Sequence, residues 1–234
     1  MKGIIYYTDN MVDDQIAKWA RKSISNAYLA VVSTSLEPID FGLNIVVEGD
    51  RGYVAMISQI ITALENLWTD YVFFCEHDVL YPKSHFDFKP LRDDIYYYNK
   101  NVWRWAFGSD HAIRYDRMIC LSGMCCHREL ALAHYRLKWD AIQSAGESQF
   151  ESRDPGLARV WGHEPGTKKK KRGGLTDEDF DTWSSEEPLI DIRHRNTFSP
   201  TKTRICDFKH APVGWEEISI DNISEWNLKQ LFNL

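Results

Sequence analysis

The sequence predicts an α/β fold in which helices flank a mostly parallel central sheet. Short apolar runs of strand length alternate with segments of helical periodicity over residues 3–75. That alternation is typical of parallel strands buried between helices. Polar side chains directly follow three of the expected strands, and open parallel sheets bind ligands at the carboxyl ends of their strands.

The first half of the chain is regular, and each element follows from its local pattern. Unbroken apolar runs predict buried strands, whereas apolar residues spaced by three or four predict helices. The expected elements are a strand at 3–8, a helix at 12–25, strands at 27–34 and 43–47, a helix at 54–67 and a strand at 71–75.

The second half of the chain is less regular. Residues 144–187 are rich in glycine, serine and charge, and they show no clear periodicity. The expected elements are strands at 102–108, 117–121 and 189–192 and a helix from about 127 to 143.

Composition and charge restrict the class of protein. The chain has 234 residues and a net charge of −6, so its surface as a whole does not attract polyanions. Its five cysteines include one adjacent pair, Cys125–Cys126, and no spacing typical of a zinc site, which favours a reducing, cytoplasmic compartment. There is no basic-then-apolar leader and no run of about 18 apolar residues, so we expect no membrane span.

The most informative segment is the acidic end of the strand at 71–75, where Glu76, His77 and Asp78 follow an aromatic run. Since strand side chains alternate, Glu76 and Asp78 are expected on one side, with His77 on the other side or turned along the rim. Two neighbouring carboxylates repel each other unless a cation lies between them, and Mg or Mn suits such oxygen ligands. The alternative is a solvated turn after a buried strand.

Two further polar strand ends are expected at the same edge of the sheet. Thr8, Asp9 and Asn10 follow the first strand, and Arg51 lies in a glycine-flanked turn after the third. Glycines beside Arg51 let the backbone approach a phosphate closely. The alternatives are a helix cap for the first group and a solvated turn arginine for the second.

These parts, in this order, resemble a GT-A glycosyltransferase, and family 2-like enzymes are the nearest match. The resemblance rests on Glu76-His77-Asp78 standing where the family has Asp-X-Asp, and on His194 after a short later strand. It covers residues 3 to about 200. It implies a GT-A type fold and a divalent cation, Mn or Mg, that binds the diphosphate of a nucleotide-sugar.

The resemblance also implies how the chain is divided. We expect a single domain over residues 1–234 with an irregular C-terminal region on the acceptor side. Its parts are a nucleotide-binding half at 1–80 and an acceptor-side half at 81–234 that carries a basic loop at 165–176.

The family's metal-binding roles carry over to particular residues. Asp78 is the expected metal ligand, and Glu76 contacts the nucleotide or the metal, although glutamate departs from the family's aspartate. His194 is a second expected ligand; alternatively it caps a helix or joins a basic cluster with its arginine neighbours. His77 is expected to be structural or to face the nucleotide. The expected contacts to the nucleotide-sugar are Thr8, Asp9, Asn10, Arg51, Glu76 and His77.

The acceptor side is less clearly marked. An inverting family member needs a carboxylate to take the acceptor's proton, for which Glu151 is the candidate and Asp154 the reserve. A retaining enzyme needs no such base. Trp105 is the one aromatic acceptor contact that we expect, and the alternative is that it packs in the core. The expected acceptor contacts are Gly123, Trp105, Lys169 and Lys170.

The basic run at 168–172 bears on the acceptor. It is a solvated loop or a contact to a phosphate backbone. Because some family 2-like enzymes glycosylate viral DNA bases, the preferred acceptor is a 5-hydroxymethylpyrimidine in DNA, in a host cytoplasm if the protein is viral. A saccharide of a surface glycan, modified in the cytosol, fits nearly as well. The alternatives from other classes are a sugar nucleotidyltransferase, a non-catalytic nucleic-acid-binding module that uses the lysine run, and a scaffold protein.

Overall fold

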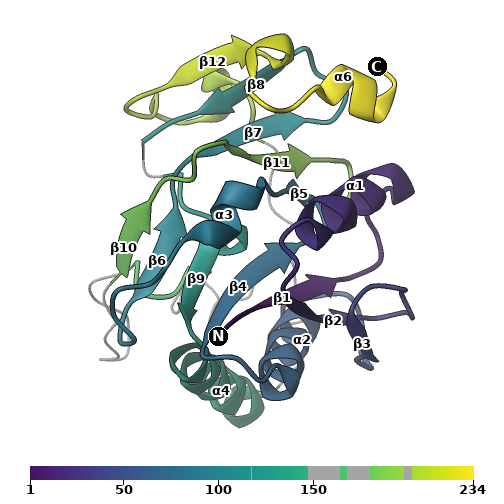
Figure 1. The fold of residues 1–234 in the computed structure, drawn as a ribbon, viewed down its shortest axis with the longest axis vertical. Helices are drawn as coiled ribbons and strands as arrows, with labels where there is room; N and C mark the ends of the chain where they lie inside the picture. The colour runs from purple at the N-terminus through teal and green to yellow at the C-terminus, as the bar shows by residue number, and fades with distance from the viewer. Residues whose placement is uncertain (117, 147–163, 168–179, 198–201) are drawn as a thin grey trace.

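The computed structural model describes residues 1–116, 118–146, 164–167, 180–197 and 202–234. Two β-sheets and the helices that pack on them make up this part of the chain (Figure 1). The helices are α1 (Asp14–Ser25), α2 (Tyr53–Asn66), α3 (Lys83–Asp87), α4 (Arg128–Ala145) and α6 (Leu228–Phe232).

The larger sheet has seven strands, and its first four are all parallel. One short strand, β9, runs antiparallel to both of its neighbours, β4 and β6. The order across this sheet is β3 (Leu43–Val46), β2 (Ala30–Ser35), β1 (Lys2–Thr8), β4 (Tyr71–Glu76), β9 (Met124–His127), β6 (Tyr96–Asn99) and β10 (Phe180–Trp183).

The smaller sheet has five strands and lies at the C-terminal side of the molecule (Figure 1). Its two central strands, β7 and β11, are parallel although a long stretch of chain separates them. The order is β12 (Glu216–Ser219), β8 (His111–Arg114), β7 (Val102–Ala106), β11 (Leu189–Arg193) and β5 (Val79–Leu80).

Both faces of the larger sheet are buried, which explains why its strands are continuous apolar runs. Along β1, Ile5 and Tyr7 pack with α2 and α4 on one face. Ile4 and Tyr6 pack on the other face, where α1 and α3 lie. The predicted fold class, an α/β fold with a mostly parallel sheet flanked by helices, is confirmed.

A short ladder of the smaller sheet lies close to the acidic end of β4. β5 pairs antiparallel with β11, so that Asp191 lies opposite Val79. The N–H of Ile192 also donates to the carbonyl oxygen of Asp78 at 2.9 Å. The residues that follow β4 therefore lie beside the end of a strand more than a hundred residues later.

Two details of the predicted elements are wrong. The strand expected at 117–121 does not form over its described residues; Leu121–Gly123 is a 3₁₀ turn, and the strand comes later, as β9. Cys125 and Cys126 are buried on this strand. The second strand begins at Ala30 and not at residue 27, because Tyr28 has a positive φ of 55° that breaks the strand.

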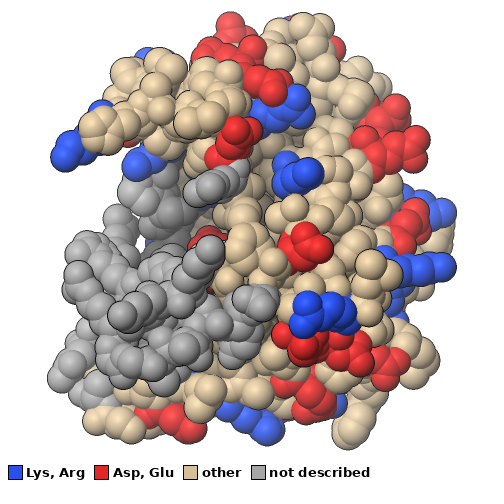
Figure 2. Space-filling model, turned by 90° about the vertical axis from the view of Figure 1, so that its left-hand side faces the viewer, with Lys and Arg blue, Asp and Glu red and all other residues tan. Residues whose placement is uncertain are grey.

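The surface and the helices give two further facts. On the face shown in Figure 2, basic and acidic side chains are interspersed and do not form large areas of one sign. Of the helices in the described part of the chain, none has both the length and the apolar character that crossing a bilayer requires.

Candidate functional site

A cleft of about 1540 Å³ opens at the carboxyl ends of β1, β4, β7 and β11. The start of α2 and the segment after β11 complete its walls. Three of the predicted polar strand ends contribute to it, through Thr8 and Asp9, Arg51, and the acidic segment at 76–78. These strand ends lie together at one edge of the sheet, as the parallel order of the strands predicts.

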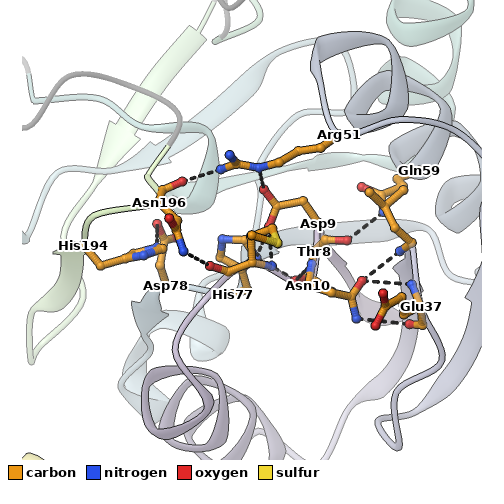
Figure 3. Close-up of polar contacts among 12 residues, drawn as sticks. Thr8, Asp9, Asn10, Glu37, Arg51, Gln59, His77, Asp78, His194 and Asn196 are labelled. Atoms are coloured by element: carbon orange, nitrogen blue, oxygen red, sulfur yellow. Dashed lines mark hydrogen bonds and ion pairs between the residues drawn. The ribbon is translucent and has the colours of Figure 1, made fainter.

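His77, Asp78 and His194 form a cluster in this cleft that is competent to hold a cation. One ligand atom from each lies within 4.8 Å of the others. The strand β4 ends at Glu76 and the chain turns at His77, so of the two orientations expected for His77 the structure shows the turn along the rim. The turn brings His77, and not Glu76, beside Asp78 (Figure 3).

The ring of His77 is held through one of its nitrogens. Nδ1 lies 2.7 Å from the hydroxyl oxygen of Thr8 and 3.6 Å from a carboxylate oxygen of Asp9. A carboxylate accepts only, so its proximity favours a proton on Nδ1. That tautomer leaves Nε2 with the lone pair a cation needs, in the arrangement typical of metal-binding histidines.

His194 shows the clearest sign of a missing partner. Its Nε2 is buried and has no hydrogen-bond partner among the described residues, and it lies 3.6 Å from Oδ2 of Asp78. A cation between these two atoms would satisfy both. Two imidazoles and a carboxylate suit Mn or another divalent transition-metal ion better than Mg, which prefers oxygen ligands.

The charges of the two acidic residues differ in environment. Burial alone would raise the pKa of Asp78. His194, His77 and Arg193 outweigh this effect, so the pKa of the Asp78 carboxyl lies below its usual value. Burial, reinforced by the charge of Asp78, raises the pKa of Glu76. Glu76 accepts a hydrogen bond of 2.8 Å from the hydroxyl of Tyr7 and lies outside the cation cluster.

Arg51 joins three parts of the chain across the cleft (Figure 3). Its guanidinium donates to the carboxylate of Asp9 and to the backbone carbonyl of Asn196. The side chain of Asn196 in turn donates to the carbonyl of Met11 at 2.7 Å. The segment that carries His194 is thereby held against the end of β1.

Asn10 and Gln59 have structural contacts at the same strand end. The side-chain oxygen of Asn10 accepts from the N–H groups of Leu36 and Glu37, which ties the ends of β1 and β2 together. Gln59 donates to the carbonyl of Thr8 at 2.8 Å from within α2. The nucleotide contact expected from Asn10 therefore competes with bonds that its amide already makes.

One wall of the cleft was missed by sequence reasoning. Asp191, which is 3% exposed, accepts hydrogen bonds from Arg104 at 3.0 Å and from Arg193 at 2.6 Å. All three residues line the cleft. The alternation of a polar residue between apolar ones in both β7 and β11 is the sequence signal that identifies them.

The acceptor residues are placed differently from the expectation. Trp105 is fully buried in the core of the smaller sheet, so the acceptor contact predicted for it is wrong. Gly123 is buried in the 3₁₀ turn, with Asn99 and Cys120 around the position of a Cβ. The predicted residues Glu151, Asp154, Lys169 and Lys170 lie outside the described residues.

No protein-family model and no curated protein matches the sequence. Solved structures similar to the fold include a glycosyltransferase involved in glycosylation of the major capsid of PBCV-1, with 10% identity, coverage of 81% of this chain and 92% of that one, and a TM-score of 0.45. TarS of S. aureus in complex with UDP-GlcNAc has 10% identity, coverage of 88% and 63%, and a TM-score of 0.43.

A further similar structure is the inositol-1-phosphate CTP transferase of T. maritima, with 10% identity, coverage of 99% of this chain and 94% of that one, and a TM-score of 0.39. Glycosyltransferases and a nucleotidyltransferase are thus both among the structures to which the fold is similar. Likeness at these TM-scores carries no argument about function, which depends on the side chains of the cleft.

Proposed function

We propose that this protein is a metal-dependent glycosyltransferase that moves a sugar from a nucleotide-diphosphate sugar to an acceptor hydroxyl. The observation that carries the proposal is the cluster of His77, Asp78 and His194 at converging strand ends, with Arg193 beside it. Such a cluster suits a cation that binds a diphosphate, and the arginine suits the charge of the leaving group.

The described residues would divide the work as follows. His77, Asp78 and His194 would hold Mn or Mg, which supplies Lewis acidity to the departing diphosphate. Arg193 would stabilise the negative charge that builds on the leaving oxygen. Thr8 and Asp9 keep the ring of His77 in its ligand orientation.

The base and the acceptor remain proposals that follow from the sequence. If the reaction inverts configuration, Glu151 or Asp154 takes the proton of the acceptor hydroxyl. The acceptor is a 5-hydroxymethylpyrimidine in DNA or a saccharide, and Lys169 and Lys170 favour the polyanion.

A thermal-unfolding titration with Mn and UDP tests the binding step. A ligand that binds only the folded state stabilises it by about 2.7 kcal/mol when its concentration is 100 times Kd. We expect this stabilisation in the wild type and its loss in Asp78→Asn. No shift in the wild type, or an undiminished shift in Asp78→Asn, would exclude the proposed cation site.

A matched control lies outside the cleft. Asp110 is an exposed carboxylate that lies 3.1 Å from the ring of His111, so it repeats the carboxylate–imidazole contact outside the cation cluster. We expect Asp110→Asn to keep the full shift. Transfer assays over a panel of nucleotide-sugars, with and without hydroxymethylated DNA and with saccharides, then identify donor and acceptor.

A further inference from the structure

The group of Arg104, Asp191 and Arg193 is a rigid part of the cleft that the proposed function uses only in part. Asp191 and Arg104 are register partners on the parallel strands β11 and β7. Arg193 lies two residues beyond Asp191, on the same side of β11. One carboxylate oxygen, Oδ2 of Asp191, accepts from both guanidiniums, so this residue contributes to the position of both.

This group places two guanidiniums beside the cation cluster. Both of them pair with the one carboxylate of Asp191. Burial alone would lower the pKa of Arg193, but Asp191, Asp78 and Glu76 outweigh it and keep the guanidinium protonated. The side chains of Arg104 and Arg193 are only 13% and 11% exposed, so solvent screens this charge poorly.

A cation in the cluster would therefore meet a positive neighbour. Asp78 lies within electrostatic reach of Arg193, so a divalent ion bound to Asp78 would repel that guanidinium. An anion that contacts both the ion and the arginine pair removes the repulsion. A diphosphate has the charge for both contacts, and guanidiniums match phosphate oxygens with paired hydrogen bonds.

We propose that Asp191 is a positioning residue that fixes Arg104 and Arg193 as a paired subsite for the diphosphate of the nucleotide donor. This inference rests on the proposed function and assigns the subsite to β7 and β11. A carboxylate that only neutralised the arginines would weaken anion binding, whereas one that aligns them strengthens it. The two roles predict opposite effects when the charge of Asp191 is removed.

Calorimetric titration of UDP into Mn-saturated protein separates these roles. We expect Asp191→Asn to weaken UDP binding by about 10-fold or more, the size of a lost charge-assisted contact. Arg104→Lys, which keeps the charge but loses the planar fork, is expected to show a loss of similar size. In steady-state kinetics, KM for the donor rises more than kcat falls.

The smaller sheet supplies a matched control. Glu216 on β12 accepts two hydrogen bonds from Arg114, at 3.0 and 2.6 Å, in an arginine–carboxylate pair outside the cleft. Glu216→Gln is expected to bind UDP as the wild type does. Asp191→Glu restores the charge but moves the carboxylate, so it is expected to recover only part of the lost affinity.

Each outcome decides the inference. UDP binding in Asp191→Asn that equals or exceeds wild-type binding overturns the positioning role. If circular dichroism shows that Asp191→Asn is unfolded, wild-type affinity in Arg104→Lys overturns it instead. A wild type that binds Mn without UDP contradicts the diphosphate subsite alone, whereas a wild type that binds neither contradicts the proposed function as well.

Discussion

The two sheets contribute to the cleft in different ways. β1 and β4 of the larger sheet are adjacent, parallel and buried on both faces, and they end in Thr8, Asp9, His77 and Asp78. β7 and β11 of the smaller sheet are short strands, and the pair of Arg104 and Asp191 is separated by 87 positions. The parallel strands β1 to β4 follow from local apolar pattern, whereas the pairing of β7 with β11 joins segments that lie far apart in the chain.

This difference shows how the candidate site depends on the whole fold. Two cation ligands come from the turn after β4, and the third comes from the segment after β11. The ladder between β5 and β11 brings these segments together. The smaller sheet is therefore part of the site and not an appendage to it.

The largest expected effect comes from removing the ligand that the smaller sheet supplies. Loss of outer contacts to metal ligands costs about 10–100-fold in metal affinity, so His194→Gln is expected to cost about 100-fold or more. Electron paramagnetic resonance of Mn in the presence of UDP measures the affinity. His210→Gln, at an exposed histidine, is the control. Unchanged Mn affinity in His194→Gln would mean that the larger sheet suffices.

The stability of the two cores tests whether the sheets unfold together. Ile5 and Ile190 are fully buried in the larger and smaller sheets, and replacing either with alanine is expected to cost about 2–5 kcal/mol. Because Phe73 of one sheet packs in the same cluster as Leu189 of the other, both variants should shift one common transition.

Denaturant unfolding followed by tryptophan fluorescence and by circular dichroism measures this. Two separate transitions, each shifted by only one of the variants, would contradict the single domain predicted for residues 1–234. Leu137→Ala, at a half-exposed position on α4, is the control and should change stability by less than about 0.5 kcal/mol.

The pH dependence of stability reports on His85 of α3, which packs against the larger sheet. His85 is fully buried against Phe73 of β4 and Trp183 of β10, and burial lowers its pKa from 6.5 to about 3. Below pH 6.5, His85 binds a proton in the unfolded chain but not in the folded chain. The free energy of unfolding therefore falls as the pH decreases from 6.5 towards 3. The expected slope from this group is about 1.4 kcal/mol per pH unit.

His85→Gln tests this assignment because glutamine does not titrate. Its unfolding free energy should depend less on pH between 6.5 and 4 than that of the wild type, as measured by urea titrations across that range. His210→Gln should keep the wild-type slope. The same slope in His85→Gln as in the wild type would assign the acid sensitivity to other groups.

The smallest expected effect concerns the contact between the two sides of the cleft. Asn196→Ala removes the hydrogen bond from the Asn196 side chain to the carbonyl of Met11, while the ligand His194 itself is not mutated. Since such outer contacts orient a ligand without binding the ion, we expect about 10-fold weaker Mn binding. Asn227→Ala, which removes a cap of α6 at a residue that does not line the cleft, should leave Mn binding unchanged. Equal affinities in the two variants would mean that Asn196 does not orient His194.

The sequence predicted the polar strand ends but not which residue of each segment faces the cleft. Trp105 was expected there, and its neighbour Arg104 lies there instead, because alternation on a strand exchanges core and cleft with a shift of one residue. Likewise, Glu76 was expected beside Asp78, but β4 ends at Glu76 and the turn brings His77 there. Which side chains of a short segment face the cleft therefore depends on the residue at which the strand ends.

The alternation along β11 marks Asp191 as a polar residue on one face of the strand, but it does not show which residue pairs with it. The importance of Asp191 comes from Arg104, 87 positions earlier, and from the cleft that both residues line. Short strands with long-range partners leave little local pattern, which is also why β6, β8 and β12 were not predicted. The expected cation ligands Asp78 and His194 are brought together, whereas their role stays a prediction.

By itself, the sequence determined the α/β class, the buried parallel strands and the polar residues at their ends, because apolar periodicity and burial are local properties of the chain. Only the tertiary structure decided that His77 joins Asp78 and His194, that Trp105 is core, and that Asp191 holds two arginines. The physical reason is that these contacts depend on register between distant strands, which is set by the packing of the whole molecule.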